Sequence, residues 1–111
     1  MTTGPFHGKA YHGGPRRVAA FRIDPKRGAY FTSDRAYALE HGEVLHVCLL
    51  NLERPIWHSE AQANADMEID REVLIGRGHD GRIIAYDDGS FDYVAFHPTQ
   101  IEVVQVIKER T

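Results

Sequence analysis

The last third of the chain alternates short apolar runs with clusters of turn-forming residues. Residues 82–86, 91–96 and 101–107 form three such runs, and each is typical of a β-strand. The sequence Asp-Asp-Gly-Ser at positions 87–90 predicts a hairpin turn between the first two strands. The C-terminal part of the fold is therefore expected to consist mainly of strands.

The first half has shorter apolar runs set among glycine, proline and arginine. We expect short strands at residues 9–12, where Gly13-Gly14-Pro15 ends the run, and at residues 29–32. Residues 43–52 are almost continuously apolar, which predicts a strand covered on both faces and ended by Pro55.

Helices are predicted in two places. Ser33 or Asp34 can cap a helix that runs to about His41, and Gly42 is well placed to end it. Residues 58–76 predict one or two amphipathic helices, because apolar side chains recur every four residues with acids between them. These apolar residues are Ala61, Ala65, Ile69 and Val73. The expected architecture is α+β, with residues 1–111 as a single domain.

Composition narrows the classes of function. The net charge is −3, from 13 Lys and Arg against 16 Asp and Glu, so a nucleic-acid binder acting through bulk positive charge is not expected. No apolar stretch approaches the length of a membrane span, and residues 1–8 show no secretory signal. The single cysteine, Cys48, lies in an apolar run and is expected to be a buried, inert thiol. These features predict a cytoplasmic protein.

Three short segments carry the candidate chemistry. They are Tyr-His-Gly-Gly at 11–14, Gly-Ala-Tyr-Phe-Thr at 28–32, and Asp-Tyr-Val-Ala-Phe at 92–96 followed by Gln100. In that order they resemble the His-Tyr-acid arrangement of ADP-ribosyltransferases, the NAD-consuming enzymes that include poly-ADP-ribose polymerases and diphtheria-type toxins. The Gly-His-Asp-Gly turn at 78–81 and the ending at 96–101 look closer to small ADP-ribosyltransferase-like domains of phage and mobile-element polyvalent proteins.

The resemblance implies a split β-sheet with one or two short helices, and it implies a role for each matched residue. Tyr30 and His41 would hold the nicotinamide of NAD, and His12 with Gly13 would fix the ribose and the carboxamide. Asp92 would assist attack at the anomeric carbon. Here Asp92 stands where the larger family has Glu, which shortens the side chain by one methylene. Gly14 replaces the family's hydroxyl residue, and His41 replaces its second Tyr.

The activity implied is mono-ADP-ribosyl transfer from NAD to a macromolecular acceptor, expected to be a protein, with release of nicotinamide. Two alternatives stay open. A weak or inactive module with the same fold would bind NAD or a protein partner, and an NAD glycohydrolase would use water at the same site. No metal is expected, because no His pair shows His-x3-His spacing and Cys48 has no Cys partner nearby.

Each matched residue also has a simpler interpretation. His12 could be a turn histidine, Tyr30 a core aromatic and Asp92 a solvated residue after a hairpin. A basic arm, made of Arg16, Arg17, Arg22, Lys26 and Arg27, could contact the NAD pyrophosphate or an acidic acceptor. A solvated loop explains the arm equally well.

Overall fold

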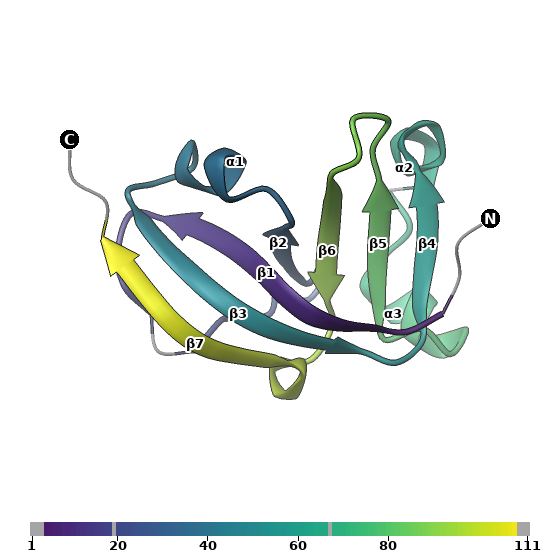
Figure 1. Ribbon diagram of the computed structural model, residues 1–111. Coiled ribbons are helices and arrows are strands. Elements are labelled where there is room, and N and C mark those ends of the chain that lie inside the picture. Colours follow the sequence, from purple (N-terminus) through teal and green to yellow (C-terminus); the bar gives the residue numbers. More distant parts are fainter. Residues whose placement is uncertain (1–3, 19, 67, 109–111) are drawn as a thin grey trace.

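A computed structural model describes residues 4–18, 20–66 and 68–108, which form an α+β fold around one mixed, seven-stranded sheet (Figure 1). The strands are β1 (Phe6–Gly14), β2 (Ala29–Thr32), β3 (Val44–Leu52), β4 (Pro55–Ser59), β5 (Gly81–Ala85), β6 (Phe91–Ala95) and β7 (Ile101–Lys108). The helices of the described residues are α1 (Arg35–Leu39), α2 (Glu60–Asp66) and α3 (Arg71–Gly76), with a 3₁₀ turn, η1 (Pro98–Gln100), before β7.

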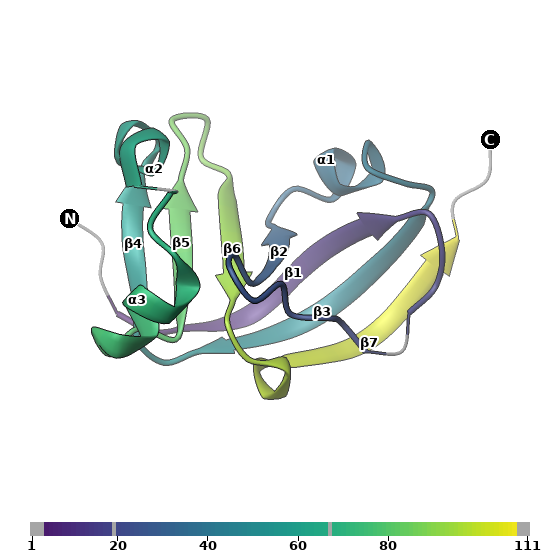
Figure 2. The same cartoon turned by 180° about the vertical axis from the view of Figure 1, so that it is seen from behind.

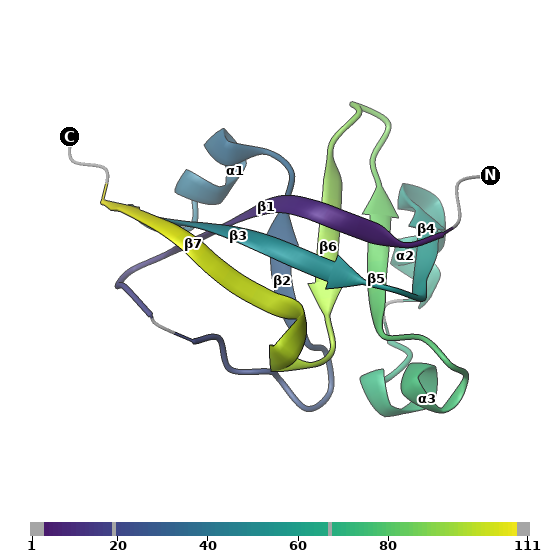
Figure 3. The same ribbon diagram turned by 60° about the horizontal axis from the view of Figure 1, so that its bottom comes forward.

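The sheet has two halves that meet at a narrow junction. Its strand order is β4-β5-β6-β2-β1-β3-β7, and β1 pairs with β2 at the single position Tyr11–Thr32. By contrast, β1 and β3 pair along their whole length, from Phe6–Leu52 to Gly14–Val44. Strands β1 and β3 cross in front of β6 toward β5 in Figure 3, so the two halves lie face to face. Side chains at the junction are therefore shared by both halves.

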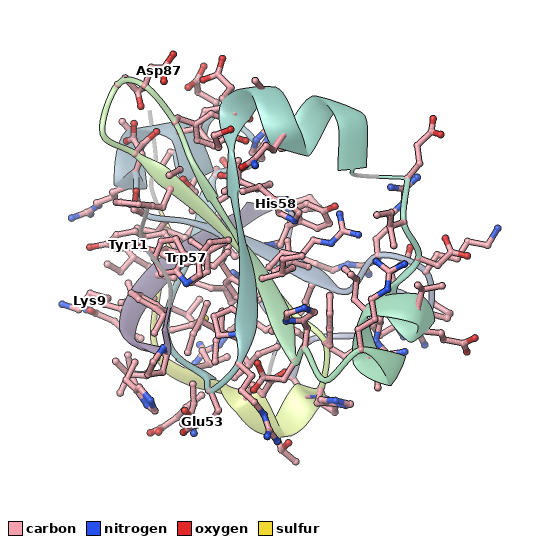
Figure 4. All side chains as sticks on the ribbon, turned by 90° about the vertical axis from the view of Figure 1, so that its right-hand side faces the viewer. Lys9, Tyr11, Glu53, Trp57, His58 and Asp87 are labelled. Atoms are coloured by element: carbon pink, nitrogen blue, oxygen red, sulfur yellow. The ribbon has the colours of Figure 1, made fainter. Side chains whose placement is uncertain are left out.

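The main core fills the space between the halves. Its buried members come from five strands, and they are Ala10, Ala29, Phe31, Cys48, Leu50, Leu52, Ile83, Tyr93 and Ala95. Burial raises the pKa of the Cys48 thiol to about 12, so this cysteine stays protonated. On the edge strand β4, Trp57 points toward this core and His58 points to the opposite side (Figure 4). Helices α2 and α3 lie on that opposite side, which Figure 2 presents to the viewer.

Several predicted elements form close to their expected positions. The strand predicted at 29–32 is β2, and the three C-terminal strands are β5, β6 and β7. Gly89 adopts a φ of 90° in the predicted hairpin turn, a conformation that favours glycine. Asp34 caps α1 by accepting a hydrogen bond from the main-chain N–H of Tyr37 at 3.2 Å, although the helix ends at Leu39 rather than near His41.

The strand predicted at 43–52 ends at Leu52, before Pro55, but Pro55 also begins a strand that was not predicted, β4. The carboxylate of Asp80 accepts hydrogen bonds from the main-chain N–H groups of Glu53 and Arg54, both at 2.8 Å, and so closes a tight turn after β3. Strand β4 then pairs in parallel with β5 at the edge of the sheet. A proline is tolerated there, as the first residue of an edge strand.

The four-residue repeat at residues 58–76 does not mark one buried stripe. Two short helices form here, in agreement with the prediction of one or two, and with α1 the described residues have three α-helices, one more than the resemblance implies. Ala61 and Val73 are exposed, while Leu74 is fully buried against Val94 and Phe96. Ala65 lies outside the side chains that the structure describes. Each helix is too short for one repeat to run through both.

Residues 43–52 were predicted to be covered on both faces, and this holds for only part of β3. Val44 to Cys48 are buried without interruption, but Leu49 and Asn51 are exposed. No helix among the described residues is long and apolar enough to cross a membrane.

Candidate active site

A cavity of about 190 Å³ lies at the junction of the two half-sheets, beside α1. Strands β1, β2 and β6 supply its walls, and α1 with the turn after it closes one side. We call it the central cavity. It is lined by Tyr11, His12, Gly13, Tyr30, Phe31, Thr32, Tyr37, Ala38, His41 and Asp92. All five residues singled out from the sequence are among them.

Successive side chains of β2 point to opposite faces of the sheet, so only one of its two aromatic residues packs in the core. Phe31 is 3% exposed and packs between the half-sheets, whereas its neighbour Tyr30 is 37% exposed and borders the cavity. Strand β2 pairs with β6, and in that register Thr32 lies opposite Asp92. The pairing brings the acid of the late motif beside the tyrosine of the middle one.

His12 is tied to β2 by a hydrogen bond across the junction. Its Nδ1 lies 3.0 Å from the carbonyl oxygen of Tyr30. A carbonyl only accepts, so Nδ1 is the donor in this bond, and Nε2 is the nitrogen left for a ligand. The ring also meets Phe21 edge-on, with centroids 4.8 Å apart. His12 is therefore held in one orientation, with one nitrogen available to a ligand.

His46 on β3 supports His12 from behind and is itself fully buried. Its Nε2 accepts a hydrogen bond from the Val18 main-chain N–H at 3.0 Å, and its Nδ1 donates to the His12 carbonyl at 3.3 Å. Burial is the main cause that lowers the pKa of His46 below its ordinary value. The neutral ring thus links β3, the arm after β1 and the backbone of His12.

Asp92 is half-buried and accepts a short hydrogen bond. The hydroxyl of Tyr86 donates to its Oδ2 at 2.6 Å. Burial raises the pKa of the Asp92 carboxyl above its ordinary value, and the Tyr86 hydrogen bond and the neighbouring His41 act in the opposite direction. The tyrosine hydroxyl and the imidazole both favour the ionised carboxylate.

Gly13 allows α1 to approach β1 closely. A Cβ at this position would overlap the main-chain carbonyl of Ala38. Ala38 is 1% exposed and packs on Leu45 and Val47. The absence of a side chain at Gly13 thus fixes how α1 closes the cavity, a structural role that the motif alone did not reveal.

Tyr37 is a lining residue that the sequence analysis missed. It lies on α1, is 44% exposed, and its ring meets that of His41 edge-on at 4.8 Å between centroids. The signal was present in the sequence, because Tyr37 precedes His41 by one helical turn. Two rings, rather than His41 alone, therefore stand on the side of the cavity that α1 closes.

Two further cavities adjoin the central one and differ in charge. The acidic cavity, of about 410 Å³, shares Thr32, Tyr37 and Asp92 with it, and none of its described lining residues is Lys or Arg. Its other lining residues are Asp34, Glu60, Tyr86, Asp87, Asp88 and Ser90. Asp87 lies at the tip of the β5–β6 hairpin in Figure 4.

The arm cavity, of about 620 Å³, lies on the other side of His12. Arg16 and Arg22 of the predicted basic arm line it, together with Phe21 and His46. Phe21, beside Arg22, packs against both His12 and Phe31, so the backbone that carries Arg22 is attached to the site, while Arg16 and Arg22 themselves are exposed. Among the described residues, no group of three or more His, Cys, Asp or Glu side chains could hold a metal ion.

No protein-family model and no curated protein matches this sequence. Among solved structures, one described as the crystal structure of an anti-CRISPR protein is similar, with a TM-score of 0.58 and 16% sequence identity. The match covers 98% of this chain and 100% of that chain. At this identity the likeness shows a shared fold.

Proposed function

We propose that the chain is a mono-ADP-ribosyltransferase that transfers ADP-ribose from NAD to a macromolecular acceptor, expected to be a protein, and releases nicotinamide. One observation carries the proposal. His12, Gly13, Tyr30 and Asp92 from the three distant segments, together with His41 after α1, line a single cavity. The narrow β1–β2 junction supports the ADP-ribosyltransferase-like split sheet that the resemblance implies.

The size of the central cavity suits one end of NAD. Pockets that enclose drug-sized ligands measure roughly 300–1,000 Å³, so a cavity of about 190 Å³ would hold the nicotinamide and its ribose rather than the whole dinucleotide. The exposed ring of Tyr30 would stack on the cationic nicotinamide, with Tyr37 and His41 on another wall. Nε2 of His12 would accept from a ribose hydroxyl.

The charged side chains around the two adjoining cavities favour one direction for the rest of NAD. The pyrophosphate carries negative charge, which the carboxylates around the acidic cavity would repel. Arg16 and Arg22 border the arm cavity on the other side of His12 and would attract it. The ADP half would therefore lie along the basic arm, and the acceptor would approach from the acidic cavity.

Asp92 would act on the reacting ribose. Cleavage of the bond to nicotinamide develops positive charge at the anomeric carbon while a neutral base departs, and a nearby carboxylate stabilises that charge. Asp92 lines both the central and the acidic cavity. From this place it could also orient an acceptor group for attack.

The direct test is mass spectrometry of lysate proteins after incubation with the protein and NAD. Attachment of one ADP-ribose to a protein would support transfer. Nicotinamide release without any adduct would favour the NAD glycohydrolase. If neither occurs and NAD or a protein partner still binds, the non-catalytic module is the correct alternative.

We also propose that the chain acts as an effector of a phage or mobile element. The support is the shared fold with a protein described as an anti-CRISPR, together with the resemblance to phage polyvalent-protein domains. Expression in a bacterium protected by a CRISPR system should then restore phage plaques, and Asp92→Asn should not. Equal plaque numbers with and without the wild-type protein, across the CRISPR types tested, would contradict this setting.

A further inference from the structure

A side-chain hydrogen bond links Tyr86 to Asp92, the acid of the central cavity. The Tyr86 hydroxyl lies 2.6 Å from Oδ2 of Asp92. O–H···O⁻ bonds of roughly 2.5–2.7 Å are typical of a hydroxyl donating to an ionised carboxylate. The bond engages one carboxylate oxygen and leaves Oδ1 for a ligand.

We propose that Tyr86 is a positioning residue that holds the Asp92 carboxylate ionised and in one orientation for action on the ribose. This inference rests on the proposed ADP-ribosyl transfer and adds a residue that none of the three sequence motifs contains. Tyr86 lines the acidic cavity and is absent from the lining of the central one. Tyr86 therefore contacts Asp92 from the acidic cavity, the side proposed for the acceptor, and not from the central cavity proposed for nicotinamide.

The backbone that carries Tyr86 is anchored by the hairpin turn. Its main-chain N–H donates to the Ser90 carbonyl at 3.0 Å, and its carbonyl accepts from the Gly89 N–H at 3.1 Å. Asp88 in turn accepts hydrogen bonds from the main-chain N–H of Ser90 at 2.9 Å and from its hydroxyl at 2.6 Å. The hydroxyl of Tyr86 is thus presented by a closed turn, which lowers the entropy lost in holding Asp92.

Asp92 also needs such a donor because of its surroundings. Burial raises its pKa, and the two groups that lower it are Tyr86 and, less strongly, His41. The titratable side chains that line the central and acidic cavities together with Asp92 are Tyr11, His12, Tyr30, Asp34, Tyr37, His41, Glu60, Tyr86, Asp87 and Asp88. Without the hydroxyl, the Asp92 pKa should rise and the carboxylate should be lost at a higher pH.

The matched test removes single hydroxyl groups. Tyr86→Phe keeps the ring and both main-chain hydrogen bonds of the turn, whereas Tyr93→Phe removes a hydroxyl from the core side of β6. Nicotinamide release from NAD is measured against pH for the wild type and both variants. We expect Tyr86→Phe to lower kcat about tenfold, the scale of a hydrogen bond to a charged group. Its acidic limb should move to higher pH, with NAD affinity unchanged, and Tyr93→Phe should match the wild type.

Wild-type kcat and an unmoved acidic limb in Tyr86→Phe would overturn the inference while leaving the proposed function intact. An inactive wild type would instead overturn the proposed function, and a second measurement separates the two. NMR titration of the Asp92 carboxyl carbon reports its pKa without any reaction. A higher pKa in Tyr86→Phe than in the wild type would support the control of Asp92 by Tyr86, and equal values would refute it.

Discussion

The Nδ1 of His12 lies 3.0 Å from the main-chain oxygen of Tyr30, so the first and second motifs are joined across the junction of the half-sheets. The bond reaches the backbone of Tyr30 and leaves its ring for the cavity. Substitution of the Tyr30 side chain should therefore change ligand contacts without releasing His12. This separation makes Tyr30 a clean probe of the proposed nicotinamide site.

We expect Tyr30→Ala to weaken NAD binding about tenfold, because an aromatic contact with a desolvated cation contributes about 1–2 kcal/mol. Tyr30→Phe keeps the ring and should bind nearly as well as the wild type. Calorimetric titration of NAD, in an Asp92→Asn background so that NAD is not consumed, measures both. Equal dissociation constants for Tyr30→Ala and Tyr30→Phe would show that the ring does not stack on the ligand.

Replacing Gly13 by alanine should destabilise the fold by about 2–4 kcal/mol, since the new methyl group overlaps the Ala38 carbonyl and must displace α1. Gly76 provides the matched control, because a Cβ there meets no atom within 4 Å. Urea unfolding of the two variants measures the difference. A Gly13→Ala protein as stable as Gly76→Ala would contradict the close packing of α1 on β1.

Local patterns allowed much of the site to be predicted. Alternation in a strand separates Tyr30 from Phe31, and the hairpin signal at 87–90 fixes the pairing of β5 with β6. The resemblance then identified five lining residues, whose chemical roles stay predictions. Side-chain alternation in a strand and the register of a hairpin depend on residues that are close in the sequence, so both could be predicted from the sequence.

Contacts between distant residues could not be predicted in the same way. The turn before β4 depends on Asp80 binding the backbone of Glu53 and Arg54, which no local pattern shows. Tyr86 and Asp92 lie close together in the sequence, within the predicted hairpin, but their contact depends on the exact register of β5 against β6. Both are side-chain contacts that depend on tertiary register, so they leave no periodic signal in the sequence.

Acid should destabilise the fold through His46. The pKa of His46 in the folded protein lies below the ordinary value of 6.5, so on acidification the unfolded chain binds the proton at a higher pH than the folded protein does. Stability is therefore lost as the pH falls from 6.5 towards the folded pKa. We expect the melting temperature to fall between about pH 7.5 and pH 5.5, a range that lies above the ordinary pKa of carboxyl groups. His46→Gln keeps an acceptor for Val18 and should flatten this dependence. An equally steep decline in His46→Gln would assign the effect to other groups.

Lengthening Asp92 to Glu should lower activity, although the larger ADP-ribosyltransferase family uses Glu. The Asp92 carboxylate already lies 2.6 Å from Tyr86, so an added methylene would lose that contact or crowd the ribose. Initial rates of nicotinamide release at saturating NAD compare the two proteins. A large gain in Asp92→Glu would indicate a cavity laid out for Glu and a site that has decayed.

The central claim is that Asp92 in the central cavity acts on NAD, and the most direct measurement is the rate of nicotinamide release by three proteins. These are the wild type, Asp92→Asn, and Glu102→Gln as a control carboxylate on the exposed side of β7. We predict release by the wild type and the control, and a fall of at least about 100-fold in Asp92→Asn with NAD binding retained. Equal rates in Asp92→Asn and the wild type, or no release by any of the three, would contradict the account.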